Sequence, residues 1–72
     1  MINIDLTNYL GQPLELSVYD GIGRKVMQTR FTTLESAVVE VSVRELMLTS
    51  GVYYVRIGTG KEITAKAFVV SR

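Results

Sequence analysis

The chain has 72 residues, of which 47 % are hydrophobic and 21 % are charged, and its formal net charge is +1. It contains no Cys and no His. A disulfide framework, a zinc site of the usual kind and a Ser-His or Cys-His nucleophile are therefore excluded. The small net charge and the absence of a basic run argue against nucleic acid as a partner. The apolar fraction is too high for a disordered tail, and the length allows one small domain.

Alternation of apolar and polar residues with a period of two dominates the chain. This pattern is typical of strands that have one buried and one solvated face. It predicts strands near residues 2–6, 14–19, 24–31, 37–43, 51–57 and 62–70. β-branched and aromatic residues are concentrated in these runs, as expected for a pleated, half-buried surface.

Turn residues separate the predicted strands. Residues 9–13 hold the single Pro, and residues 32–36 form a polar connection. In the segment 20–23 an Asp side chain can accept hydrogen bonds from following backbone amides, and Gly tolerates positive φ, so we predict a tight hairpin. A second hairpin is predicted at 58–61, and the segment 44–48 is the one candidate for a helical turn. This spacing of strands and turns predicts an antiparallel sandwich or a small barrel.

Two of the predicted strands leave open which side chains face inward. In the third strand one face carries Lys25, Met27, Thr29 and Phe31, and the other carries Val26 and Gln28. In the last strand one face carries Ile63, Ala65, Ala67 and Val69, and the other carries Phe68 and Val70. A β-bulge would reverse the facing partway along either strand. For the last strand, the alternative is that both faces are covered.

None of the usual chemical motifs is complete. The segments 21–24 and 58–61 resemble fragments of phosphate-binding loops but lack the remaining spacing and the following helix, so we interpret them as turns. The carboxylates are scattered singly, which gives no acid–base pair and no Asp-rich calcium loop. No apolar run approaches the length of about 20 residues that a transmembrane helix needs, and residues 1–5 do not resemble a signal peptide. No enzyme activity and no cofactor are expected.

Three segments, taken together and in order, resemble one known family. The first spans residues 16–26 and contains Asp20, Gly23 and Arg24. The second spans residues 50–57 and contains Gly51, Val52 and Tyr53. The third, close to the end of the chain, contains Lys66, Phe68, Val69 and Val70. This order resembles the C-terminal sorting domain of the type IX (Por) secretion system of Bacteroidetes, and the resemblance covers about residues 14–72.

The resemblance implies an all-β fold, namely a small immunoglobulin-like antiparallel β-sandwich of about six to seven strands. It implies that residues 1–72 form a single domain at the C-terminal end of a larger secreted protein. Such a domain directs an N-terminal cargo through an outer-membrane translocon. A sortase-like peptidase then removes the domain, and the cargo is released or anchored at the cell surface. The implied route leads through the periplasm to the outer membrane, the cell surface or the extracellular space.

Roles for the motif residues follow from their positions. Asp20, Gly21 and Gly23 are expected to shape the first hairpin, and Gly51 to permit the turn into the fifth strand. The last strand is a candidate edge, and an edge strand is a template for pairing with another chain. We therefore predict that the translocon recognises the final hairpin, residues 51–72, partly by backbone pairing.

Two further questions stay open at the level of sequence. A small sandwich with uncovered edges gains stability from pairing, so we expect a homodimer, in one form by strand exchange, with a monomer as the alternative. The alternative function is that of an immunoglobulin-like adhesion or carbohydrate-binding module. A concave row of exposed tyrosines would favour carbohydrate binding. Because Tyr53 and Tyr54 are adjacent, they are expected to point to opposite faces of their strand.

Overall fold

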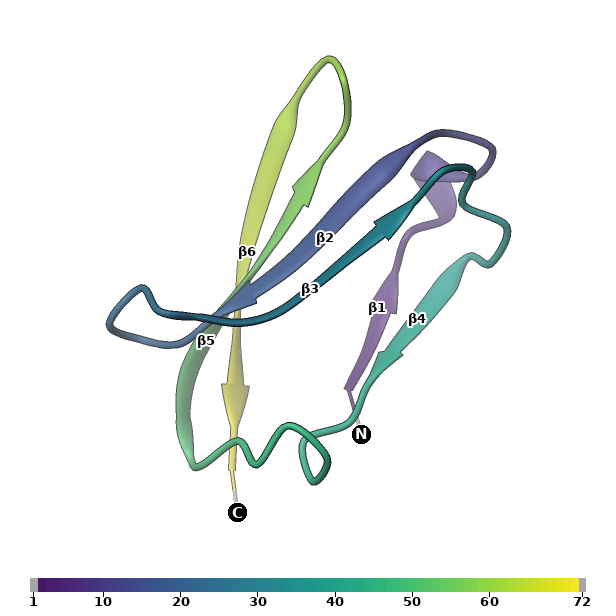
Figure 1. Cartoon of the computed structure of the whole chain (residues 1–72). Helices are drawn as coiled ribbons and strands as arrows, with labels where there is room; N and C mark the ends of the chain where they lie inside the picture. The colour runs from purple at the N-terminus through teal and green to yellow at the C-terminus, as the bar shows by residue number, and fades with distance from the viewer. Residues whose placement is uncertain (1, 72) are drawn as a thin grey trace.

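The structure is a computed structural model that describes residues 2–71, and its strands form two antiparallel sheets (Figure 1). The smaller sheet pairs β1 (Ile2–Asp5) with β4 (Val38–Val41). The larger sheet has the order β3-β2-β5-β6. Its strands are β2 (Leu14–Tyr19), β3 (Lys25–Phe31), β5 (Gly51–Gly58) and β6 (Ile63–Val70). A short 3₁₀ helix, η1 (Thr7–Tyr9), follows β1.

The predicted strands are confirmed, and each of their ends lies within two residues of the observed one. Both predicted hairpins are also present, because β2 and β3 are antiparallel neighbours, as are β5 and β6. The two sheets are separate, so the fold is a small all-β sandwich and not a barrel. Within residues 2–71, no helix has the length and apolar character required to cross a membrane.

A single hydrophobic core joins the two sheets. It receives side chains from both sheets and from three of the connections. The buried members are Ile4, Leu6, Leu14, Leu16, Val18, Leu34, Val41, Leu48, Tyr53, Val55, Ile57 and Val70. Burial of these side chains is the main term that stabilises so small a fold.

The inward face of β3 changes at a β-bulge. Val18 pairs with Met27, whereas the next residue, Tyr19, pairs with Lys25, so Val26 is the extra residue on β3. Val26 and Met27 both pack against the core as a result. The bulge foreseen for one of the two ambiguous strands is therefore confirmed on β3.

The last strand turns its larger side chains inward. Val70 is buried and Phe68 packs against the core, whereas the opposite face is exposed. That exposed face carries Ile63, Ala65, Ala67 and Val69. Of the two arrangements considered for this strand, the one with Phe68 and Val70 inside is correct, and the outer face has no cover within residues 2–71.

Two connections are held by specific backbone contacts. Leu34 is fully buried within the connection predicted to be polar, and it exchanges backbone hydrogen bonds with the loop before β2, at Gly11 and Gln12. The predicted helical turn is present as one turn after β4. The Leu48 amide donates to the carbonyl of Val43, and the Met47 amide donates to that of Arg44. This pair of bonds is the Schellman arrangement that ends helices.

Candidate recognition site

The register of the large sheet brings the second and third motif segments face to face. At the start of β5 and the end of β6, Gly51 pairs with Val70, Val52 with Val69, and Tyr53 with Phe68. These six residues, with the turn Asp20–Arg24 that lies beside them, are called the motif end below. Lys66 lies further along β6, opposite Val55.

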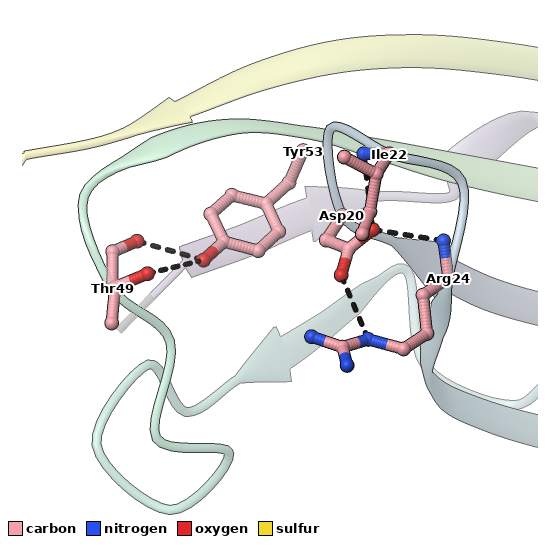
Figure 2. Close-up of polar contacts among 5 residues, drawn as sticks. All are labelled: Asp20, Ile22, Arg24, Thr49 and Tyr53. Atoms are coloured by element: carbon pink, nitrogen blue, oxygen red, sulfur yellow. Dashed lines mark hydrogen bonds and ion pairs between the residues drawn. The ribbon is translucent and has the colours of Figure 1, made fainter.

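The first motif segment is a turn organised by one carboxylate. Oδ1 of Asp20 accepts hydrogen bonds from the backbone amides of Ile22 (3.1 Å) and Arg24 (2.8 Å). Oδ2 accepts one from Nε of Arg24, also at 3.1 Å (Figure 2). The amide of Arg24, helped by its guanidinium and by the amide of Ile22, lowers the pKa of Asp20. Asp20 therefore holds the β2–β3 hairpin, as predicted, and Arg24 serves the same turn.

Gly21 brings this turn against the second motif segment. A Cβ placed on Gly21 would lie 3.3 Å from the carbonyl oxygen of Val52, which is closer than an ordinary van der Waals contact. The absence of a side chain at Gly21 thus lets the β2–β3 turn pack directly on the backbone of β5. All three motif segments consequently meet at one end of the sheet.

Tyr53 ties the start of β5 to the residues before it. Its side chain is buried, and its hydroxyl donates a hydrogen bond of 2.7 Å to the carbonyl oxygen of Thr49 (Figure 2). Its ring stacks on that of Phe68, with 5.7 Å between the ring centroids and an interplanar angle of 19°. A tyrosine that bonds back to the backbone just upstream is known as a corner-stabilising device in β-sandwiches.

Two of the motif glycines have backbone conformations that other residues avoid. Gly23 has φ +87° and Gly51 has φ +153°, and a Cβ at either position would meet no atom within 4 Å. Conformation alone, not crowding, therefore explains glycine at these two positions. The predicted roles of Gly23 and Gly51 in turn formation are consistent with these angles.

The outward side of the motif end is apolar. Val52 and Val69, which pair across β5 and β6, have exposed fractions of 45 % and 71 %. Lys66 is exposed and shares the inward-facing side of β6 with Phe68. It lies near β1, where Thr7 is the main cause of the lowered pKa of Asp5 and Lys66 adds a weaker attraction. Val52 and Val69 thus form an exposed apolar pair at the motif end.

Among the described residues, the motif end has neither an acidic cluster nor a row of exposed tyrosines. Within residues 2–71, no group of three or more Asp or Glu side chains gathers where it would hold a metal ion. The tyrosines do not form an exposed row either. Tyr53 is buried, Tyr9 and Tyr19 are half-buried, and Tyr54 is exposed. The feature that would favour a carbohydrate-binding module is therefore not seen among these residues.

Sequence reasoning missed two features of this region. One is Thr49, whose backbone carbonyl accepts the Tyr53 hydrogen bond, because a carbonyl leaves no mark on residue identity. The other is Gly21 as a point of close packing. The sequence does show a second glycine inside the hairpin, but turn formation alone is enough to explain it.

Comparison with known protein families identifies the family of this chain. The profile of the family described as "Secretion system C-terminal sorting domain" matches residues 1–71. The match thus includes β1 and η1, which lie before the segments that carry the resemblance seen in the sequence. No match is found among curated proteins or among solved structures. With the profile covering nearly the whole sequence, the chain belongs to the family of C-terminal sorting domains of the type IX secretion system.

Proposed function

We propose that this domain directs an N-terminal cargo protein across the outer membrane by presenting its final hairpin, β5–β6, to the secretion translocon. A sortase-like peptidase then separates the domain from the cargo, which is released or anchored at the cell surface. The domain itself acts as a sorting signal and performs no catalysis. Its route leads from the periplasm to the outer membrane.

The observation that carries this proposal is the position of β6 at the edge of the large sheet. Natural sheets protect their edges with bulges, charges, Pro or short strands. The opposite edge strand, β3, carries a bulge at Val26 and the charged residues Lys25 and Arg30. β6 runs for eight residues, and Lys66 is its sole charged residue. An unguarded edge of this kind suits pairing with an added strand.

The motif end supplies the specificity in this proposal. Added-strand binding obtains affinity from backbone hydrogen bonds and selectivity from side chains beside the edge. Val69 and Val52 form an exposed apolar pair at the end of β6. The turn at Asp20 packs on the backbone of Val52 through Gly21. The stacked rings of Tyr53 and Phe68 belong to the next residue pair along the two strands.

The test is secretion of a reporter protein that carries this domain at its C-terminus in a host with the secretion system. Deletion of residues 66–72 is expected to retain the reporter in the cell. Because that deletion also removes most of β6, the decisive variant is Val69→Lys, which alters an exposed side chain. Val38→Lys is the matched control, since Val38 is a strand valine with 46 % exposure on β4, outside the motif end.

We expect Val69→Lys to lower secretion strongly and Val38→Lys to leave it unchanged. Equal secretion of the two variants would refute the motif end as the recognition surface. Normal secretion after deletion of residues 66–72 would refute a role for the final strand altogether.

The same free edge of β6 is the surface through which we propose that two copies pair into a homodimer. Pairing of two β6 strands would remove both unguarded edges at once. Light scattering over a concentration series measures the mass directly. A monomer mass that persists to high concentration contradicts the homodimer.

A further inference from the structure

A hollow of about 480 Å³ lies on the outer face of the large sheet, away from the motif end. Its floor is formed around Gly58, which pairs with Glu15 on β2 and with Ile63 on β6. A Cβ at Gly58 would meet only the Glu15 carbonyl oxygen, at 3.9 Å. Absence of a side chain at Gly58 therefore leaves open space at this point of the sheet surface.

The charged groups around the hollow are two arginines and one glutamate. Arg30 and Arg56 belong to β3 and β5, and Glu15 belongs to β2 between them. Nε of Arg30 donates a 2.9 Å hydrogen bond to Oε2 of Glu15, and Arg30 is also the main cause of the lowered pKa of Glu15. Arg56 also interacts with Tyr19 and is the main cause of the lowered pKa of that hydroxyl. Each guanidinium has five N–H donors, so Glu15 and Tyr19 do not exhaust the pair. The lining thus carries one net positive charge.

The rest of the lining is suited to a ligand that has apolar groups as well as a charged group. Ile63, with 61 % of its surface exposed, stands at one side, and Pro13 contributes apolar surface at the other. Ser17, the residue opposite Arg56, adds a hydroxyl. The volume falls within the usual range for small-molecule and side-chain pockets, about 300–1,000 Å³.

From these observations we propose that the hollow over Gly58 binds an acidic side chain of an extended peptide. Its carboxylate lies between Arg30 and Arg56, and an apolar side chain two residues along the peptide lies against Ile63, because side chains two residues apart share one face of an extended chain. Charge complementarity selects the carboxylate, since a planar guanidinium recognises this group by paired hydrogen bonds. The apolar surface of Ile63 and Pro13 selects a peptide with apolar residues two positions before and two positions after the acidic one. This site is separate from the motif end, so its existence does not depend on the proposed secretion role.

The experiment titrates the isolated chain with the blocked peptide acetyl-Val-Thr-Glu-Thr-Val-amide, whose one charge is the glutamate. Binding is followed by the backbone amide resonances of Ser17, Gly58 and Ile63. We expect saturable shifts at these residues, and an affinity about tenfold above that of the same peptide with Gln in place of Glu, because a charge-assisted bond is lost.

Variants of the chain then locate the carboxylate. Arg56→Gln should weaken binding of the Glu peptide about tenfold. Arg44→Gln, which removes the same charge from an exposed turn outside the hollow, should leave binding unchanged. Gly58→Val keeps both arginines but fills the hollow, and it should abolish the shifts. If Arg56→Gln does not fold, Gly58→Val still tests whether the peptide binds in the hollow.

Three results would overturn the proposal. The first is equal affinity for the Glu and Gln peptides. The second is equal loss of affinity with Arg56→Gln and Arg44→Gln, which would indicate attraction by net charge alone. The third is the absence of saturable shifts at Ser17, Gly58 and Ile63.

Discussion

The hydroxyl of Tyr53 donates a 2.7 Å hydrogen bond to the backbone carbonyl of Thr49, four residues earlier in the chain. This bond closes the corner through which the chain enters β5. Because the same ring stacks on Phe68 of β6, the corner and the final strand are held by one side chain. Tyr53 therefore links the geometry of the turn to the position of the proposed recognition strand.

Removing this hydroxyl should weaken the fold by a measurable amount. We expect Tyr53→Phe to lower the free energy of unfolding by about 1 kcal/mol, the usual net contribution of one hydrogen bond. The ring stack with Phe68 is kept in this variant. The control is Tyr54→Phe, on the same strand but exposed, for which a change within about 0.5 kcal/mol is expected. Urea unfolding measures both variants, and equal effects would contradict the role assigned to the corner.

Gly51, at the corner before β5, has an unusual backbone angle, whereas Gly60 does not. Gly51→Ala should destabilise the fold by about 1–3 kcal/mol, because φ +153° is strained for any residue with a Cβ. At Gly60 no such φ occurs and a Cβ would meet no atom within 4 Å. Gly60→Ala should therefore be neutral or stabilise the fold by up to about 1 kcal/mol. A Gly51→Ala variant as stable as Gly60→Ala would show that the backbone angle at Gly51 is not required.

Met47 is the opposite case, because it has a strained backbone angle that glycine would adopt without strain. It has φ 56° at the position after the helical turn where glycine is preferred, and 81 % of its surface is exposed. Met47→Gly should stabilise the fold by about 1 kcal/mol, since no packing is lost and the left-handed strain is removed. Thermal unfolding checks this. A lower melting temperature for Met47→Gly would mean that the Met47 side chain has a contact role.

The Asp20 turn makes a pH-dependent contribution to stability. The pKa of Asp20 is lowered in the folded state, chiefly by the Arg24 amide. The contribution is therefore present in full above the unfolded value of about 3.9, and it is lost as pH falls through the folded value. Asp20→Asn retains a carbonyl oxygen for the backbone amides but does not titrate.

We expect the wild-type chain to be more stable than Asp20→Asn at about pH 7, with the difference shrinking at about pH 2. Unfolding in urea at the two pH values measures this difference. A gap between the two proteins that is independent of pH would contradict the assignment. An NMR titration of the Asp20 carboxyl group gives the direction of the shift directly.

Strand positions were predictable because local alternation is enough to define them. Val39 and Val41, for example, alternate with polar residues and do form part of β4. The bulge at Val26 could be foreseen as a possibility but not placed, because register depends on the partner strand β2. The facing of β6 likewise depended on which side chains the core has room for. Phe68 and Val70 fill the available space in the core, although the opposite face of β6 also carries apolar residues.

The candidate site was predictable in its residues and not in its assembly. Asp20 and Gly51 are recognisable in the sequence, because turn chemistry requires particular residue types. The direct pairing of Val52 with Val69 follows only from the β5–β6 register, and the contact of Gly21 with Val52 depends on how the β2–β3 turn packs against β5. The hollow over Gly58 also arises from four strands at once, so no local sequence pattern predicts it.

The most direct test of the account is export of a reporter that carries a signal peptide at its N-terminus and residues 1–72 at its C-terminus. The reporter would be measured in cells and in the culture medium or at the cell surface, in a host with a working type IX system and in the same host with the translocon disrupted. We predict that the reporter leaves the cell only when the translocon is intact. Retention in both strains, or export from both, would contradict the sorting function.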